Sequence, residues 1–224
     1  MAILTKTQLK DGKLWRRRVY YAHIPKCAGT SLYIAFLRAG WQIENVNLHP
    51  KMGLGPKVYE EFGISQFQRR GSVETLGKRS IQHAPFNVWR LWGQFDESFA
   101  IVRNPRDRYL SALKFQYMGR TRGKADFEEF RAKTLSVLQR GWRARRRHFD
   151  GHFAPQTDFL GPATQTYRFE SDFVEKLAGQ YGLASAAFPE LNTAQTSDIN
   201  LNSSELEFIS KVYKSDADKL GYEI

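Results

Sequence analysis

The sequence predicts a single α/β domain with a central, mainly parallel β-sheet flanked by helices. Two short runs, 19–24 (VYYAHI) and 98–102 (SFAIV), are rich in β-branched and aromatic residues and have the length of buried strands. A tight turn and a helical pattern follow each run. Strands that alternate with helices in this way are typical of parallel sheets.

The composition is that of one folded domain. The chain has 224 residues, of which 42% are hydrophobic and 25% are charged, and a chain of this length can bury its own core. We therefore predict one domain over 1–224, in which 1–18 is a basic N-terminal segment that can be flexible. Neither a signal peptide nor a membrane-spanning stretch is visible, so we expect a cytoplasmic protein.

The charge balance indicates an anionic partner. Lys and Arg total 34 and Asp and Glu total 23, which gives a net charge of +11. A nucleotide, a nucleic acid, an acidic glycan or a membrane surface would all fit this charge. The single cysteine, Cys27, excludes an internal disulfide and a cysteine-rich metal site.

The first half of the chain supplies a strand, a loop and a helix in that order. The strand 19–24 ends at Pro25, and the pattern predicts a helix that begins at Thr30 and stops near Gly40. Residues 41–80 are mixed in character and contain several glycines, so we expect short elements and loops there.

The second half is predicted to be mostly helical. The spacing of apolar residues predicts helices over 106–118, 125–149 and 171–181. The second of these carries the basic run Arg143–Arg147, which we interpret as a solvated helix face. The alternative is an electropositive rim for an acidic acceptor or for the nucleotide. A final helix begins at a capping box formed by Ser204 and Glu207.

Residues 23–31, HIPKCAGTS, form the most informative stretch. A tight loop between a buried strand and a helix N-terminus points successive N–H groups at one spot, and the helix dipole favours an anion there. Gly29 allows close approach of the backbone, Lys26 supplies a mobile charge, and the hydroxyls of Thr30 and Ser31 can donate. The alternative is an ordinary turn in which Thr30 caps the helix and Lys26 is solvated.

The details of this loop differ from those of an ATPase loop. In a Walker A motif the lysine directly precedes Ser or Thr, whereas Lys26 precedes Thr30 by four residues. Strand 98–102 runs into Arg103, where an NTPase often has an acidic Mg²⁺ ligand. A P-loop kinase or NTPase is thus the second hypothesis. A basic nucleic-acid-binding protein is the third and has no recognisable binding motif in its favour.

The loop resembles the 5′-phosphosulfate loop of sulfotransferases, especially the carbohydrate-type group (sulfotransferase family 2), which reads IPKTGGTS. Cys27 and Ala28 replace Thr and Gly of that pattern, and both are small. The resemblance implies a P-loop-like domain that uses 3′-phosphoadenosine 5′-phosphosulfate as sulfuryl donor and needs no metal. It assigns donor binding in this loop to Lys26, Cys27, Ala28, Gly29, Thr30 and Ser31.

A second anion site fits the same resemblance. The family holds the donor's 3′-phosphate with an Arg after a later strand and a Ser eight residues on, and Arg103 and Ser111 match. An arginine at a strand end can grip phosphate with two parallel bonds. The alternative is a solvated Arg103 and a small packing Ser111. Residues 167–170 (YRFE) resemble the family's C-terminal pattern and add Arg168 to the predicted donor site.

The resemblance also implies catalytic roles. Lys26 is placed to stabilise the charge that develops on the leaving oxygen. A hydroxyl acceptor must lose a proton to a base, and His83 resembles a histidine that the family places between its two phosphate sites. His152 is the other candidate base, and we expect His23 to pack. The acceptor is expected to bear a hydroxyl group, with a carbohydrate, which can be acidic, as the favoured class. Its pocket is expected to come from residues 41–80 and 119–166.

Overall fold

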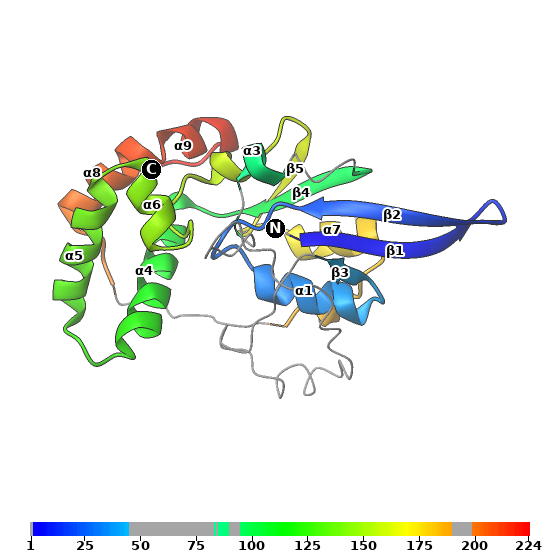
Figure 1. Ribbon diagram of the computed structural model, residues 1–224, viewed down its shortest axis with the longest axis horizontal. Coiled ribbons are helices and arrows are strands. Elements are labelled where there is room, and N and C mark those ends of the chain that lie inside the picture. Colours follow the sequence, from blue (N-terminus) through cyan, green and yellow to red (C-terminus); the bar gives the residue numbers. More distant parts are fainter. Residues whose placement is uncertain (1, 45–82, 84, 90–94, 190–198) are drawn as a thin grey trace.

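The computed structural model describes residues 2–44, 83, 85–89, 95–189 and 199–224. At its centre lies a five-stranded sheet with strand order β3-β1-β2-β4-β5 (Figure 1). The strands are β1 (Ala2–Lys10), β2 (Lys13–Tyr21), β3 (Gln42–Glu44), β4 (Glu97–Val102) and β5 (Thr164–Arg168). β2, β4 and β5 are parallel, while β1 is antiparallel to both of its neighbours. All these strands except β1 therefore run in one direction, which confirms the predicted mainly parallel sheet.

Residues 2–21 form a β-hairpin, whereas the sequence predicted no strand before Val19. β1 and β2 pair along their full length, and the first strand before the loop thus begins at Lys13 rather than at Val19 and ends at Tyr21. Asp11 and Gly12 form the turn with positive φ angles of 50° and 73°. An Asp-Gly pair between strands is a hairpin signal. The outer half of the hairpin is charged and lacks a buried apolar run, so its sequence pattern does not predict a strand.

Two helices cover one face of the sheet. The helix α1 (Gly29–Arg38) follows the loop after β2, and α7 (Phe173–Tyr181) follows β5. Phe36 of α1 and Tyr181 of α7 contact each other and Phe99 of β4, with ring centroids 5.2–6.0 Å apart. This aromatic cluster lies in the core beneath the sheet and fixes α1, and with it the preceding loop, against the strands.

Residues of α4 (Pro105–Thr121), α5 (Phe127–Gln139) and α8 (Ser203–Val212) form a second core at the other end of the molecule (Figure 1). The helix α6 (Trp142–His148) packs against α5, and Leu220 of α9 (Lys214–Leu220) packs against the first core. Shorter elements are α3 (Phe86–Trp89) and the 3₁₀ turns η3 (Gln156–Phe159) and η4 (Ser185–Ala187). The predicted helices 106–118 and 171–181 are confirmed as α4 and α7. The predicted long helix 125–149 is wrong: it breaks at Gly141, whose φ of 109° no helix contains.

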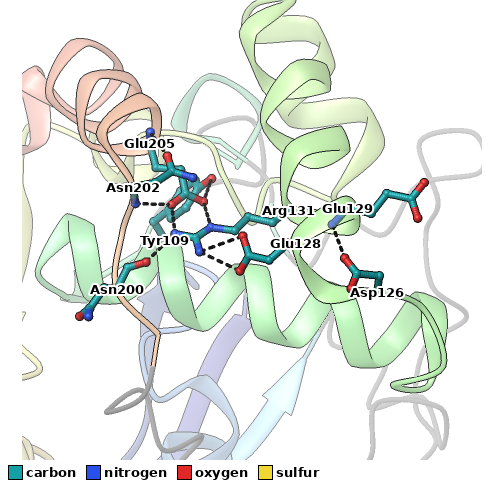
Figure 2. A network of polar contacts seen from close by, with 8 residues as sticks. All are labelled: Tyr109, Asp126, Glu128, Glu129, Arg131, Asn200, Asn202 and Glu205. Atoms are coloured by element: carbon teal, nitrogen blue, oxygen red, sulfur yellow. Dashed lines mark hydrogen bonds and ion pairs between the residues drawn. The ribbon is translucent and has the colours of Figure 1, made fainter.

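A buried polar network ties α4, α5 and α8 together (Figure 2). The fully buried Glu205 carboxylate accepts hydrogen bonds from Arg131, at 2.7 Å from Nε, and from the Tyr109 hydroxyl at 3.2 Å. The same Glu205 forms the capping box of α8 with Asn202, which donates and accepts through its backbone N–H and side chain. The capping box predicted at Ser204 and Glu207 is therefore wrong by two residues. Glu205 faces the core because it also partners Arg131.

Among the described residues, no helix combines the length and the apolar character needed to cross a membrane.

Candidate active site

The loop between β2 and α1 has an unusual backbone. Lys26 and Ala28 both have positive φ angles, 69° and 56°, which are uncommon for residues other than glycine. Such conformations cost about 1–3 kcal/mol each and gather at ligand-binding loops, where turned amides form anion-binding nests. Ala28 is the N-cap of α1 and has no side-chain acceptor for its first amides. Thr30 lies inside the helix, so it is not the cap that the alternative interpretation requires.

Only glycine fits at position 29, because the imidazole of His23 occupies the space that a side chain would need. A Cβ atom on Gly29 would lie 2.1 Å from Nε2 of His23, far inside contact distance. His23 is buried, and its Nδ1 lies 2.9 Å from the hydroxyl of Tyr33 in α1. Burial lowers the pKa of His23 well below its usual value, and the nearby His83 lowers it further. His23 thus packs as a neutral ring against the loop, as expected.

Cys27 is a buried structural residue of the loop. Its Sγ lies 3.7 Å from Oε1 of Gln156, and burial raises its pKa to about 12. The side chain therefore remains a thiol and does not act as a nucleophile. Thr30 and Ser31, in the first turn of α1, are half-buried.

The second predicted anion site lies beside the first. Arg103 follows β4, and its Nη1 donates to the carbonyl oxygen of Lys26 at 3.5 Å. Its guanidinium lies 4.7 Å from the ring centroid of Phe169, and its Nε is buried without a hydrogen-bond partner among the described residues. The parallel register brings the ends of β2 and β4 to one edge of the sheet. Ser111 lies two turns into α4 and is buried.

Gln156 connects the two strand ends, a role that the sequence analysis missed. Its side chain accepts from the backbone N–H of Arg103 at 2.9 Å and donates to the carbonyl oxygen of Arg103 at 2.8 Å. Asp216 in turn accepts from the backbone N–H groups of Gln156 and Thr157 at 2.8 and 2.9 Å. Gln156 and Asp216 are both fully buried. The available signal was a polar residue directly after the apolar run Phe153–Pro155, at the start of η3.

Arg168 lies at the same edge but has partners of its own. Its Nη2 donates to the carbonyl oxygens of Leu220 and Gly221, both at 2.7 Å, and its guanidinium lies 4.8 Å from the ring centroid of Tyr222. The side chain is exposed and satisfies the carboxyl end of α9. Donor binding by Arg168 stays a prediction.

Lys26 lies in a positive, partly desolvated environment. Burial lowers its pKa to about 8, and the charge of Arg103 contributes to the shift. Its Nζ lies 4.3 Å from the ring centroid of Phe115 in α4. Two positive charges therefore lie near this edge of the sheet, and an anionic ligand would relieve their repulsion.

A series of ring contacts leads from Lys26 to a histidine–carboxylate pair. Phe115 stacks on His152 at 5.0 Å, and His152 meets His83 edge to face at 5.2 Å. Nδ1 of His83 lies 2.9 Å from both the carboxylate Oδ2 and the carbonyl oxygen of Asp150. Although burial raises the pKa of Asp150, the hydrogen bond and charge of His83 bring it below its usual value.

The two candidate bases have different surroundings. His83 donates from Nδ1 to Asp150, which leaves Nε2 as the basic nitrogen and provides a carboxylate to stabilise the imidazolium. His152 donates from Nδ1 to the carbonyl oxygen of Phe149 at 2.7 Å, and burial lowers its pKa to about 3. His152 is therefore neutral near pH 7 and a weak base. The geometry favours His83.

The rest of the predicted site is described only in part. Residues 45–80, assigned to the acceptor pocket, lie outside the described residues. Within the basic run Arg143–Arg147, Arg143 is exposed and Arg145 donates to the carbonyl oxygen of Leu138 at 3.2 Å.

Comparison with known proteins supplies one match. The sequence profile of the sulfotransferase family matches residues 16–223. This span contains the loop around Lys26, Arg103 and the three contacting histidines His23, His83 and His152. No curated protein and no solved structure matches the chain. The profile favours a sulfotransferase over the kinase and nucleic-acid-binding alternatives. With a match over nearly its whole length and two cationic strand ends that meet at one edge of its sheet, the chain belongs to the sulfotransferase family.

Proposed function

We propose that this protein transfers a sulfuryl group from 3′-phosphoadenosine 5′-phosphosulfate to a hydroxyl group of a carbohydrate acceptor. The juxtaposition of Lys26 and Arg103 carries the proposal. Their positive side chains share one edge of the sheet, next to a loop of left-handed residues at a helix N-terminus. A ligand with two separate anionic groups, such as this donor, supplies a partner for each.

The residues fit such a donor. Nε of Arg103 is buried without a partner among the described residues, and a phosphate oxygen would satisfy it. The uncapped amides of α1 offer donors to the 5′-phosphosulfate. We assign the 3′-phosphate to Arg103 and Ser111, and the 5′-phosphosulfate to the loop that contains Lys26.

The transfer breaks the bond between sulfur and the bridging oxygen of the donor and forms a bond between sulfur and the acceptor oxygen. The Lys26 ammonium counters the negative charge that develops on the bridging oxygen. Nε2 of His83 takes the acceptor's proton, and the Asp150 carboxylate stabilises the resulting imidazolium. Because Lys26 and Arg103 neutralise the donor's charge, we expect transfer to need no divalent metal.

A screen of acceptors tests this function. The full chain would be incubated with the donor and EDTA, together with neutral glycans, acidic glycans and phenols in separate reactions. Mass spectrometry should find the gain of one sulfuryl group on a glycan, and the Lys26→Ala variant should lose this product. Products only on phenols would contradict the acceptor class. Products that require Mg²⁺, or that Lys26→Ala forms equally well, would contradict the mechanism.

A further inference from the structure

The outer half of the β1–β2 hairpin projects from the sheet. β3 pairs only with Ile3–Thr5, and β4 pairs only with Val19–Tyr21, so residues 6–17 have no third strand beside them among the described residues. In Figure 1 this ribbon extends away from the body, at the end of the molecule opposite α5 and α8. A two-stranded ribbon is only marginally stable in water by itself. A protruding ribbon without cover is a candidate contact surface.

The tip of this ribbon exposes large apolar side chains. Leu9 and Leu14 face each other across the hairpin and are 74% and 79% exposed. Trp15 lies beside Leu14 on the opposite face of the ribbon, because successive strand residues alternate, and is 37% exposed. Both faces of the tip therefore carry apolar groups. The three residues Leu9, Leu14 and Trp15 are called the apolar tip below.

Basic residues surround the apolar tip. Residues 6–18 contain Lys6, Lys10, Lys13, Arg16, Arg17 and Arg18 and only one acid, Asp11. Lys6 and Arg17 contact the rest of the domain, since their cationic groups lie 5.8 and 5.7 Å from the ring centroid of Trp41. Lys13 and Arg16 are exposed near the tip. An apolar end within a basic surround matches the surface of an anionic bilayer.

Other occupants fit this combination less well. Nucleic acid would engage the cations but would leave Leu9 and Leu14 in water. A second copy added edge to edge would bring basic side chains of the two ribbons together, and charged edges oppose such pairing. We propose that the apolar tip inserts into the headgroup region of an anionic membrane while Lys13 and Arg16 contact lipid phosphates. The active-site loop lies at the opposite end of β2, so this contact leaves it open.

Vesicle binding tests the proposal with the full chain. We expect co-sedimentation with vesicles of phosphatidylcholine and phosphatidylserine, but little with phosphatidylcholine alone. Binding should weaken as salt rises, because screening shortens the reach of the charges. The double variant Leu9→Ser/Leu14→Ser should bind at least tenfold more weakly, although its charge is unchanged. The matched control is Leu206→Ser, since Leu206 on α8 is also exposed, at 37%, and lies far from the tip.

The charged residues need their own control. Lys13→Glu/Arg16→Glu should abolish vesicle binding, whereas Lys133→Glu/Lys211→Glu changes the net charge equally on α5 and α8 and should preserve most of it. Lipid should also shift the tryptophan emission to the blue. Trp15→Phe should lose this shift, and Trp142→Phe, which removes a 50% exposed tryptophan on α6, should keep it.

Three results would overturn the proposal. The first is no binding to anionic vesicles. The second is unchanged vesicle binding by Leu9→Ser/Leu14→Ser, which would make the hairpin a purely cationic surface for a polyanion. The third is a dimer in solution that these substitutions disrupt, since a second copy would then cover the tip. Donor affinity, measured in parallel, should not change in any hairpin variant, so failure here is distinct from failure of the proposed function.

Discussion

Arg103 reaches from the end of β4 to the end of β2, where its guanidinium donates to the carbonyl oxygen of Lys26 at 3.5 Å. The two residues are separated by 77 positions in the sequence, and the parallel pairing of β2 with β4 brings them together. An anion bound at this edge would be attracted by both positive charges and would reduce the repulsion between them.

Protonation of Lys26 should accompany donor binding. Its pKa is about 8 without ligand, and the donor's negative charges should raise it. At pH 8 the binding of adenosine 3′,5′-bisphosphate should take up about half a proton, seen by calorimetry in buffers of different ionisation enthalpy. Affinity should fall above pH 8, where Lys26 loses its charge. The Lys26→Arg variant keeps its charge and should show neither effect. Equal proton uptake by that variant would contradict the assignment.

His83 should act on the acceptor alone. The His83→Ala variant should lower turnover by about 10²–10⁴-fold, the usual contribution of a positioned base. Its affinity for adenosine 3′,5′-bisphosphate should match that of the wild type. His152→Gln is the matched control and should retain most of the turnover, because the proposal assigns the base to His83. Near-normal turnover in His83→Ala would assign His83 a structural role.

Asp150 provides an independent check of the same base. Its carboxylate contacts His83 and is not placed in the donor site, so Asp150→Asn should lower turnover by at least tenfold with little change in KM for the donor. Asp150→Glu should recover part of the turnover. A loss of donor affinity in Asp150→Asn would place this pair in the nucleotide pocket instead.

Gly29 should be intolerant of alanine because of His23. The added Cβ would overlap the imidazole, and the Gly29→Ala substitution should cost about 1–3 kcal/mol of unfolding free energy. Gly119→Ala in α4 meets open space and should be neutral or stabilise by about 0.5–1 kcal/mol. In a His23→Ala background the cost of Gly29→Ala should largely vanish. An unchanged cost there, measured by urea unfolding, would show that another contact excludes the methyl group.

Gln156 should position Arg103. Replacing it with Ala leaves the backbone N–H and carbonyl of Arg103 without their partner, at about 1–3 kcal/mol for each buried group. The Gln156→Ala variant should unfold at lower urea concentration and bind adenosine 3′,5′-bisphosphate at least tenfold more weakly. Gln165→Ala on the exposed face of β5 should do neither. Normal donor affinity in a destabilised Gln156→Ala would limit Gln156 to a packing role.

The sequence was most informative where local patterns and chemistry agree. The buried strand before Arg103, the loop around Lys26 and the helix α4 were all predictable. In each case a run or a regular spacing of apolar residues is bounded by residues that end a strand or begin a helix. The hairpin was not recognised, since its outer residues are charged and its stability comes from pairing. Gln156 and Asp216 were missed because their partners are backbone groups distant in sequence, which no local pattern reveals.

The roles of individual histidines required the structure. Spacing alone could not separate His83 from His152, since both lie in irregular segments. The two differ in their partners: His83 contacts the carboxylate of Asp150, whereas His152 contacts only the carbonyl oxygen of Phe149 through its Nδ1. The reason for Gly29 also changed, from close approach of a ligand to close packing of His23.

Calorimetric titration with adenosine 3′,5′-bisphosphate and with AMP tests the assignment of the donor's 3′-phosphate to Arg103, because the two ligands differ by that group alone. The wild type should bind the bisphosphate at least tenfold more tightly, since charge-assisted hydrogen bonds contribute about 1.5–3 kcal/mol. Arg103→Ala should remove this preference, and Arg106→Ala, at an exposed position of α4, should keep it. Equal affinity of the wild type for both nucleotides would contradict the account.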